Sequence, residues 1–527
     1  MHGLATKIRP VQRRFLTVIA VVLGAFAALA VLLAIRGSLI AGFVREIAES
    51  RLSTALGQPV AIGDLGFSLT PRPAFTGSEI RIGGAAQRAP SVALDRVEVF
   101  PVLRSFLQGP IHITEVRLDG FTVSILRDAG GRWRAPAVFP APTTAAKAGG
   151  GIGIDRVRVA GGRLLIFDVD ANGALRERSR IDELRTDLLP DPQGLRLTSL
   201  TGRVGGAAIS GEAETDAQSV RLDFSATAIR DADVPALFGL LAASRPAVLR
   251  LDEPAAASVS VRIDRATSRL TGSGTLRAPA LTIEPLRLQE LNAPFVVQGT
   301  QITFTPTTFR INGGSHEGRF TLMFGDAPAW EMDGRVKDLD VGALLDTIAG
   351  RDAKLDGQGN IDAELKGRFE PGFLARMDGA ARIAVSNGVL HDFPLLATVN
   401  RALRLSEGDG QDTRFEALNA SLAISRGIAT TDDLVIQAGH LRTVLSGEIG
   451  FDRSVNLRGR AIVSAERVAA GVDSVHELAR LRKGGEIVAP LTITGSLDAP
   501  KIEIDLGTVI REGVVDEMKR RLRQLIK

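Results

Sequence analysis

The stretch Val259-Ser260-Val261-Arg262-Ile263 decides the fold class of this 527-residue chain, because apolar and polar side chains alternate along it. Successive side chains of a strand point to opposite faces of a sheet, so this pattern predicts a strand with one apolar face and one polar face. The same alternation recurs at Ile302-Thr303-Phe304 and at Lys501-Ile502-Glu503-Ile504-Asp505. The chain holds 56 glycines, and short segments between glycines favour strands joined by turns.

The strand-like segments follow one another without the helical crossovers that a parallel sheet needs, so we expect a mainly β protein. The expected body is an elongated, curved antiparallel sheet, groove-like along its apolar face, with a few short helices. These helices are expected at about 42–56, 234–243, 341–348, 394–405 and 474–481.

The apolar face of such a sheet must be covered by something. It could close as a barrel, pair with a second sheet, or stay open and hold a foreign apolar molecule. In the open case the candidate lining residues are Val259, Val261, Ile263, Ile302, Phe304, Ile502 and Ile504. A register slip of one residue would turn each of them to the other face.

An uncharged run, FLTVIAVVLGAFAALAVLLAI, covers residues 15–35. As a helix it would be about 31 Å long, enough to cross a bilayer's hydrocarbon core. Four cations and no acid precede it in residues 1–14, which predicts a cytoplasmic N-terminus and a body across the membrane. An uncleaved anchor is favoured over a signal peptide, because Ala28-Leu29-Ala30 resembles a cleavage site but lies inside the apolar run.

Residues 508–527 predict a basic amphipathic helix, since Ile510, Val514, Met518, Leu522 and Leu525 repeat at helical spacing. This helix could plug the end of the sheet. Alternatively it could contact an anionic membrane or a partner through a set of apolar and basic side chains. That set is Met518, Lys519, Arg520, Leu522 and Arg523.

Composition shifts predict where the parts of the chain begin and end. A Pro/Ala/Gly-rich linker at 135–151 has no usable periodicity. The predicted parts are a basic tail (1–14), the membrane helix (15–35), an N-terminal region (36–134), the linker (135–151), a middle β region (152–380), a C-terminal region (381–507) and the basic helix (508–527).

Residues that would carry chemistry are scarce. The chain has no cysteine, which excludes disulfides and thiolate ligands, and no two of its six histidines have metal-ligand spacing. Asp168 to Gly173 opens like a calcium loop, but the twelfth position is Ser179 where a Glu is needed, so a hairpin turn is favoured. Ser315 and His316 are neighbours in a strand and point to opposite faces. We therefore predict no catalytic residue, no metal and no cofactor.

Nucleic acid is also a poor fit as a partner. The basic excess lies at the two ends of the chain, and the body has no Tyr and only two Trp for stacking on bases.

Several segments resemble the AsmA-like family of bacterial envelope proteins. Near the N-terminus these are ALGQPVAIGD (55–64) and ITEVRLDGF (113–121), the latter leading to RDAGGRW (127–133). Near the C-terminus they are FEALNA (415–420), GIATTDDL (427–434) and PLTITGSLDAP (490–500). The resemblance covers both ends, whereas residues 200–380 match only in style.

The resemblance implies a single-pass inner-membrane protein whose body faces the periplasm, akin to lipid-transfer proteins built from a repeating β-groove. It implies no catalytic residue. The leading hypothesis is therefore a non-catalytic protein that carries membrane phospholipid along an apolar groove and supports outer-membrane biogenesis. The alternative is a periplasmic scaffold or assembly factor that binds an outer-membrane or periplasmic protein partner by strand addition.

Overall fold

The computed structural model describes most of residues 41–505, with breaks of which the longest are 84–90, 135–152, 404–409 and 465–481. The chain divides into two compact units. Unit 1 is Met1–Arg245, Glu253–Leu276 and Val296–Gly299, and unit 2 is Pro246–Asp252, Arg277–Phe295 and Thr300–Lys527. Each unit is described by itself.

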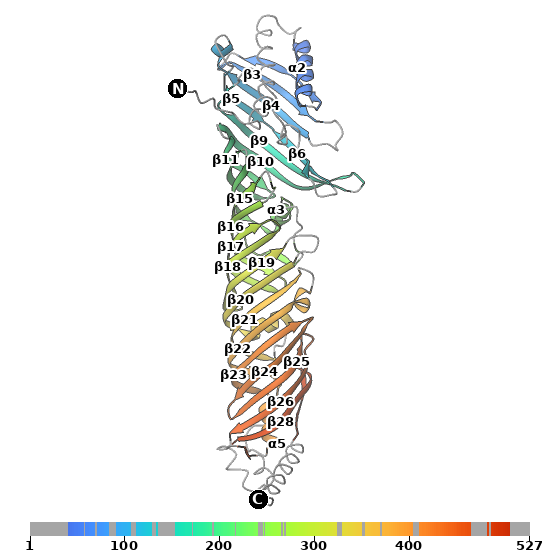
Figure 1. Ribbon diagram of the computed structural model, residues 1–527, viewed down its shortest axis with the longest axis vertical. Helices are drawn as coiled ribbons and strands as arrows, with labels where there is room; N and C mark the ends of the chain where they lie inside the picture. Colours follow the sequence, from blue (N-terminus) through green and yellow to red (C-terminus); the bar gives the residue numbers. More distant parts are fainter. Residues whose placement is uncertain are drawn as a thin grey trace, which may run out of the picture. The chain divides into compact units, whose positions relative to one another are not determined.

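Unit 1 begins with helix α2 (Ala41–Leu56), which covers the first strands (Figure 1). Ala48 and Leu52 of α2 are buried in one core cluster with Val60, Ile62 and Val99. Two polar contacts fix the helix, because Ile62 N donates to Glu49 Oε1 at 2.7 Å and Val60 N donates to Ser53 Oγ at 2.9 Å. The strands of this part are β1 (Val60–Ala61), β2 (Leu65–Ser68), β3 (Ala74–Ile82), β4 (Ser91–Pro101), β5 (His112–Asp119), β6 (Thr122–Arg127) and β7 (Trp133–Arg134). A 3-10 turn, η1 (Leu103–Phe106), follows β4.

The expectation that every strand pairing is antiparallel is wrong at one place. Strands β8 (Gly153–Ile154) and β9 (Val157–Val169) pair parallel with β5, and β9 also pairs parallel with β6. A parallel pairing needs a connection of a dozen residues or more. Residues 128–152 supply that length without a helical pattern in the sequence, which is why the pattern did not reveal the crossover.

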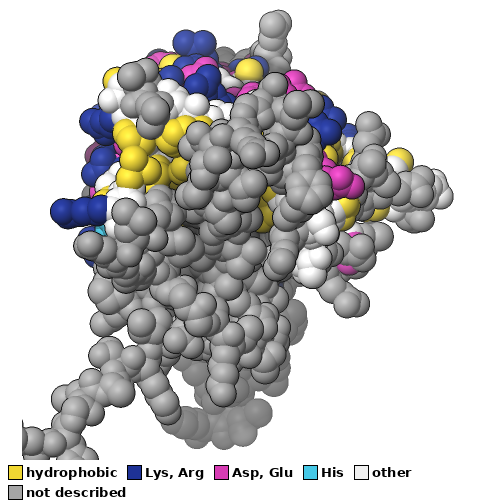
Figure 2. Space-filling view, turned by 90° about the horizontal axis from the view of Figure 1, so that it is seen from above, with side chains coloured by type: hydrophobic (Ala, Val, Ile, Leu, Met, Phe, Trp, Pro, Cys, Tyr) yellow, Lys and Arg dark blue, Asp and Glu magenta, His cyan; other side chains and the backbone are white. Residues whose placement is uncertain are grey.

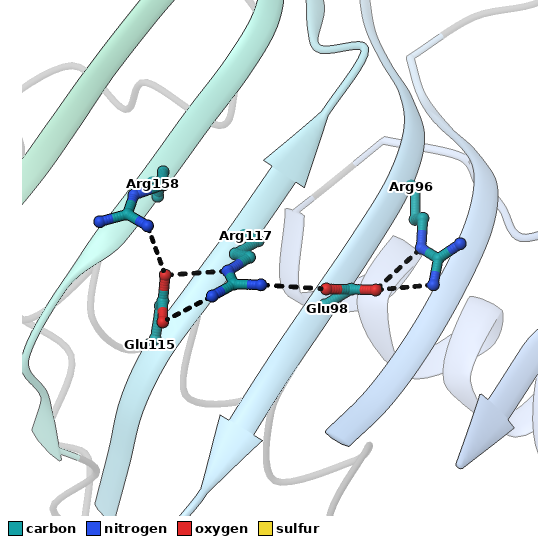
Figure 3. Close-up of polar contacts among 5 residues, drawn as sticks. All are labelled: Arg96, Glu98, Glu115, Arg117 and Arg158. Carbon is teal, nitrogen blue, oxygen red and sulfur yellow. Dashed lines mark hydrogen bonds and ion pairs between the residues drawn. The ribbon is translucent and has the colours of Figure 1, made fainter. Parts of the chain in front are cut away.

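A ladder of charged side chains crosses this parallel junction on the polar face (Figure 3). Glu115 of β5 accepts from Arg117 Nε at 2.9 Å and lies 3.3 Å from Arg158 Nη1 of β9. Glu98 of β4 accepts from Arg96 at 2.6 Å and lies 3.9 Å from Arg117. The hydrogen bond from Arg117 lowers the pKa of the Glu115 carboxyl, whose side chain is only 14% exposed. The ladder thus ties β4 and β5 to β9 by charge.

Glu115→Gln is expected to lower the free energy of unfolding by about 1–2 kcal/mol at neutral pH, because it removes the carboxylate that pairs with Arg117 and Arg158. The native pKa of Glu115 is depressed, so its contribution is present above the ordinary carboxyl pKa and is lost as pH falls through the native pKa. Chemical denaturation of both proteins as a function of pH measures this difference, which should shrink in acid. Glu214→Gln is the control, because Glu214 forms an exposed pair with Arg196 at 3.7 Å and should change stability by less than ~0.5 kcal/mol.

The rest of unit 1 is an antiparallel meander (Figure 1). Its strands are β10 (Leu175–Asp191), β11 (Gly194–Val204), β12 (Ala207–Asp216), β13 (Ser219–Ile229) and β15 (Ala255–Asp264). The predicted turn at 168–173 is confirmed as the β9–β10 hairpin. There Asp170 accepts from the backbone N–H of Asn172 and Ala174, and Asp168 pairs with Arg178. After β13 come the 3-10 turn η2 (Asp231–Asp233) and helix α3 (Val234–Leu240).

Unit 2 continues as antiparallel pairs, and strands β16 (Leu270–Ile283) and β17 (Leu286–Gln298) contribute residues to both units. Its other strands are β14 (Leu249–Leu251), β18 (Gln301–Ile311), β19 (Gly314–Met323), β20 (Ala329–Asp340), β21 (Leu355–Arg368), β22 (Asp378–Leu390), β23 (Thr413–Ser425), β24 (Ile428–Ala438), β25 (Leu441–Gly450), β26 (Ser454–Ser464), β27 (Arg482–Lys483), β28 (Glu486–Ser496) and β29 (Ala499–Ile504). Its helices are α4 (Val341–Ala349), the 3-10 turn η3 (Phe373–Arg376) and α5 (Leu395–Ala402).

The mainly β prediction is confirmed, and four of the expected helices appear as α2, α3, α4 and α5. Several predictions lie outside the described residues, namely the membrane helix at 15–35, the linker at 135–151, the helix at 474–481 and the basic helix at 508–527. Within the described part of the chain, no helix combines the length and the apolar character needed to cross a bilayer.

Candidate lipid-contacting face

The apolar side of strands β13 and β15 in unit 1 is only half covered. Val220, Leu222 and Phe224 of β13 lie directly opposite Ile263, Val261 and Val259 of β15. All six side chains are half-buried, whereas Arg221, Asp223, Ser260 and Arg262 on the other face are exposed. We call these six residues the β13–β15 face. It contains three of the predicted lining residues and three that the sequence analysis missed, although they alternate in the same way.

A row of aromatic rings crosses the apolar side of unit 2. The ring centroids of Phe295 and Phe304 are 5.5 Å apart, and those of Phe304 and Phe320 are 6.2 Å apart. The row continues to Trp330 at 6.3 Å and to Phe373 of η3 at 5.9 Å. The rings come from four successive strands and one turn, so they form one apolar strip across the sheet.

Exposure changes along this aromatic row. Phe295, Phe304 and Phe320 are half-buried, whereas Trp330 and Phe373 are buried. Phe373 and Val248 form a buried cluster with Trp330, so the protein covers its own apolar strip there. The predicted lining residues Ile302 and Phe304 lie in the half-buried part. The apolar side of unit 2 is therefore covered by the protein itself at Trp330, whereas it is only partly covered at Phe304.

The apolar side of the C-terminal strands is packed by the protein itself. Helix α5 packs against β23 and β29, and its Leu395 and Val399 are fully buried. Ile502 and Ile504 lie opposite Ile493 and Leu491, which are 0% and 1% exposed. The pair Ile502 and Ile504 is half-buried beside this core. These two predicted lining residues thus share the alternation of Val261 but adjoin a filled interior.

A buried histidine lies on the apolar side of unit 2. The ring of His316 stacks on Phe309 with centroids 4.1 Å apart and is 4% exposed. It lies over Gly318 and Gly334, where an added Cβ would crowd the ring. Burial lowers the pKa of His316 from 6.5 to about 4, so the ring is neutral near pH 7. Ser315 points to the exposed face, as predicted, and cannot act with His316 as a nucleophile–base pair.

His316→Leu is expected to make the free energy of unfolding depend less on pH in the acid range. The native pKa is lower than the unfolded value, so between pH 6.5 and about 4 the unfolded chain binds the proton and stability falls as pH falls. As pH falls over this range, the free energy of unfolding of the unsubstituted protein should therefore decrease by up to about 3 kcal/mol more than that of the His316→Leu protein. Equilibrium denaturation at several pH values measures the two slopes, and equal slopes would show that the ring is protonated in the folded chain.

The described residues hold no group of three or more His, Asp or Glu side chains able to bind a metal ion. The predicted contact residues Met518, Lys519, Arg520, Leu522 and Arg523 lie outside the described part. What the described face offers a ligand is apolar surface: half-buried aliphatic and aromatic side chains suit acyl chains and provide no charge for chemistry.

A comparison with known protein families finds a match for part of the chain. The model of the AsmA family matches residues 275–434, from β16 to β24. That stretch holds the aromatic row, α5 and two of the segments that carried the resemblance, 415–420 and 427–434. The N-terminal segments and 490–500 lie outside it, and so does the β13–β15 face. No curated protein matches the chain at a significant level. Residues 275–434 thus match the family that the resemblance named, although much of the match lies within 200–380, where the sequence analysis found only a general likeness.

Proposed function

We propose that this chain is a non-catalytic envelope protein that carries phospholipid by its acyl chains. The observation that supports this most strongly is the β13–β15 face, where six neighbouring apolar side chains stay half-buried while their neighbours on the other face are exposed. Isolated exposed apolar side chains are ordinary, but a contiguous set on one side of a sheet marks a binding surface.

Partition drives the proposed binding. Each acyl CH₂ removed from water contributes about 0.8 kcal/mol, so a chain lying on this face is favoured over the same chain in water. The face of β13 and β15 has no charged side chain of its own to trap a headgroup. A lipid held only by apolar contact can slide along such a surface.

The proposed setting is the bacterial inner membrane. The uncharged run at 15–35 would anchor the chain, and the body would face the periplasm. The AsmA-family match at 275–434 supports an envelope role that serves outer-membrane biogenesis.

The second candidate is a scaffold for outer-membrane proteins. The packed C-terminal part favours it, because Leu441, Ile487 and Ile493 are 0% exposed and lie in an interior that the protein fills with its own side chains. In this case the strands would serve as a rigid frame with edges that bind clients.

Photo-crosslinking separates the two functions. A photoreactive residue is placed at Val261 and, as the matched control, at the adjacent Ser260 on the opposite face. A third copy carries it at Ile502, beside the packed core. We expect a phospholipid adduct by mass spectrometry at Val261, and little at Ser260 or Ile502. Adducts to protein alone at Val261 would favour the scaffold and exclude cargo at this face.

A further inference from the structure

The geometry points to a membrane-contacting surface at one end of unit 1, which we propose lies against an anionic bilayer. The surface consists of η1, with Leu103 and Arg104, and the β2–β3 turn, with Pro71 and Arg72. It deepens the proposed function by stating which end of the folded body meets the anchoring membrane. It therefore rests on the anchor at 15–35 that was proposed there.

Both parts of this surface lie at the same end of the N-terminal strands. Phe67 of β2 pairs with Phe75 near the start of β3, and Phe75 pairs with Val99 near the end of β4. The turn between β2 and β3 and the η1 turn after β4 are therefore neighbours at this end.

Helix α2 begins toward the same end. Ser53 contacts Val60, Glu49 contacts Ile62, and Arg45 Nη1 donates to Gly63 O at 3.3 Å. The helix therefore runs antiparallel to residues 60–63. Because residues 60–63 lead to β2 and its turn, the N-terminal end of α2 lies toward that turn. Only residues 36–40 separate α2 from the uncharged run, and five residues span at most about 18 Å. This end is thus held near the bilayer if 15–35 crosses it.

The side chains at this end suit an anionic lipid surface. Leu103 is 44% exposed, and Pro71, Arg72 and Arg104, at the same end of the strands, are exposed as well. No carboxylate of the described residues lies within ion-pair distance of either arginine. Figure 2, which looks onto the upper end of Figure 1, shows hydrophobic side chains together with side chains of both charges. Exposed apolar groups with cations nearby bind an anionic membrane at the boundary between the lipid headgroups and the acyl chains.

The η1 turn is built to present Leu103. Ser105 Oγ donates to Val102 O at 2.6 Å, and His112 N donates to Ser105 Oγ at 2.9 Å. These bonds fix the turn to the start of β5. The exposure of Leu103 is therefore a feature of an ordered turn, and insertion would cost little further ordering of the backbone.

The absence of cysteine allows a clean fluorescence test in the full chain. Leu103→Cys carries an environment-sensitive NBD probe, and Val296→Cys is the matched control because Val296 lies in unit 1 and is 43% exposed. Each protein is reconstituted into vesicles of phosphatidylcholine with phosphatidylglycerol, and quenching by doxyl-labelled lipid is measured after flotation.

We expect the probe at 103 to show blue-shifted emission and several-fold stronger quenching than the probe at 296. Arg72→Glu together with Arg104→Glu should reduce that quenching. Water-like emission at 103 in protein that floats with the vesicles would overturn this proposal while leaving the anchor and lipid carriage intact. Protein that fails to float would overturn both the anchor and this surface. Quenching at 103 that is insensitive to the two arginine changes would overturn the anionic specificity.

Discussion

Val261→Asp is expected to reduce the phospholipid bound by the purified chain several-fold while the protein stays folded. Val261 lies in the middle of the β13–β15 face and is half-buried, so its carboxylate can keep contact with water and the fold should persist. A charged group set against an acyl chain costs on the order of 3 kcal/mol, which corresponds to about a 100-fold loss of affinity at that point. Phosphorus analysis of lipid extracted from each protein measures the loss.

The control for Val261→Asp is Ser260→Asp, which adds the same charge one residue away on the exposed face. Thermal unfolding of both variants shows whether the fold is retained. Equal lipid content in the two variants would mean that the face of β13 and β15 does not hold the lipid. A lower lipid content that comes with a collapsed melting transition would reveal a packing role for Val261.

Val399→Asp is expected to have the largest effect on stability, about 3–5 kcal/mol. The side chain is 0% exposed in α5, between strands of the filled C-terminal part, and a buried carboxylate without partners is among the costliest substitutions. Urea denaturation and limited proteolysis of the C-terminal strands would report this loss.

Arg401→Asp is the matched control, because Arg401 is exposed on the same helix and its replacement should cost less than about 1 kcal/mol. A Val399→Asp protein as stable as the Arg401→Asp protein would show that α5 does not fill the apolar interior. In that case the C-terminal strands would be open to cargo as well.

Periodicity predicted the strands well because it is a local property. The alternation at Val259 to Ile263 and at Lys501 to Asp505 identified both strands and showed that the apolar side chains of each strand share one face. The helices α2, α4 and α5 were also visible, since their apolar spacing differs from that of the strands. The crossover before β9 could not be predicted, because residues 135–151 have no usable periodicity.

What covers an apolar face is decided by contacts far apart in the sequence, and alternation does not record them. Val261 and Ile502 look alike in the sequence, yet only Ile502 adjoins a core filled by α5. Trp330 is covered by Phe373, which lies in a short turn with no periodicity of its own. The Pro-Gly pair at 371–372 marks that turn, but nothing local shows where its Phe packs.

The most direct test of the central claim is an experimental structure of the full chain purified with its native lipids, at a resolution that shows acyl chains. We predict elongated density within about 4 Å of Val259, Val261 and Ile263, and none over Ser260 or Arg262. If polypeptide fills the space over those three side chains and no lipid lies on them, the account of lipid carriage is contradicted.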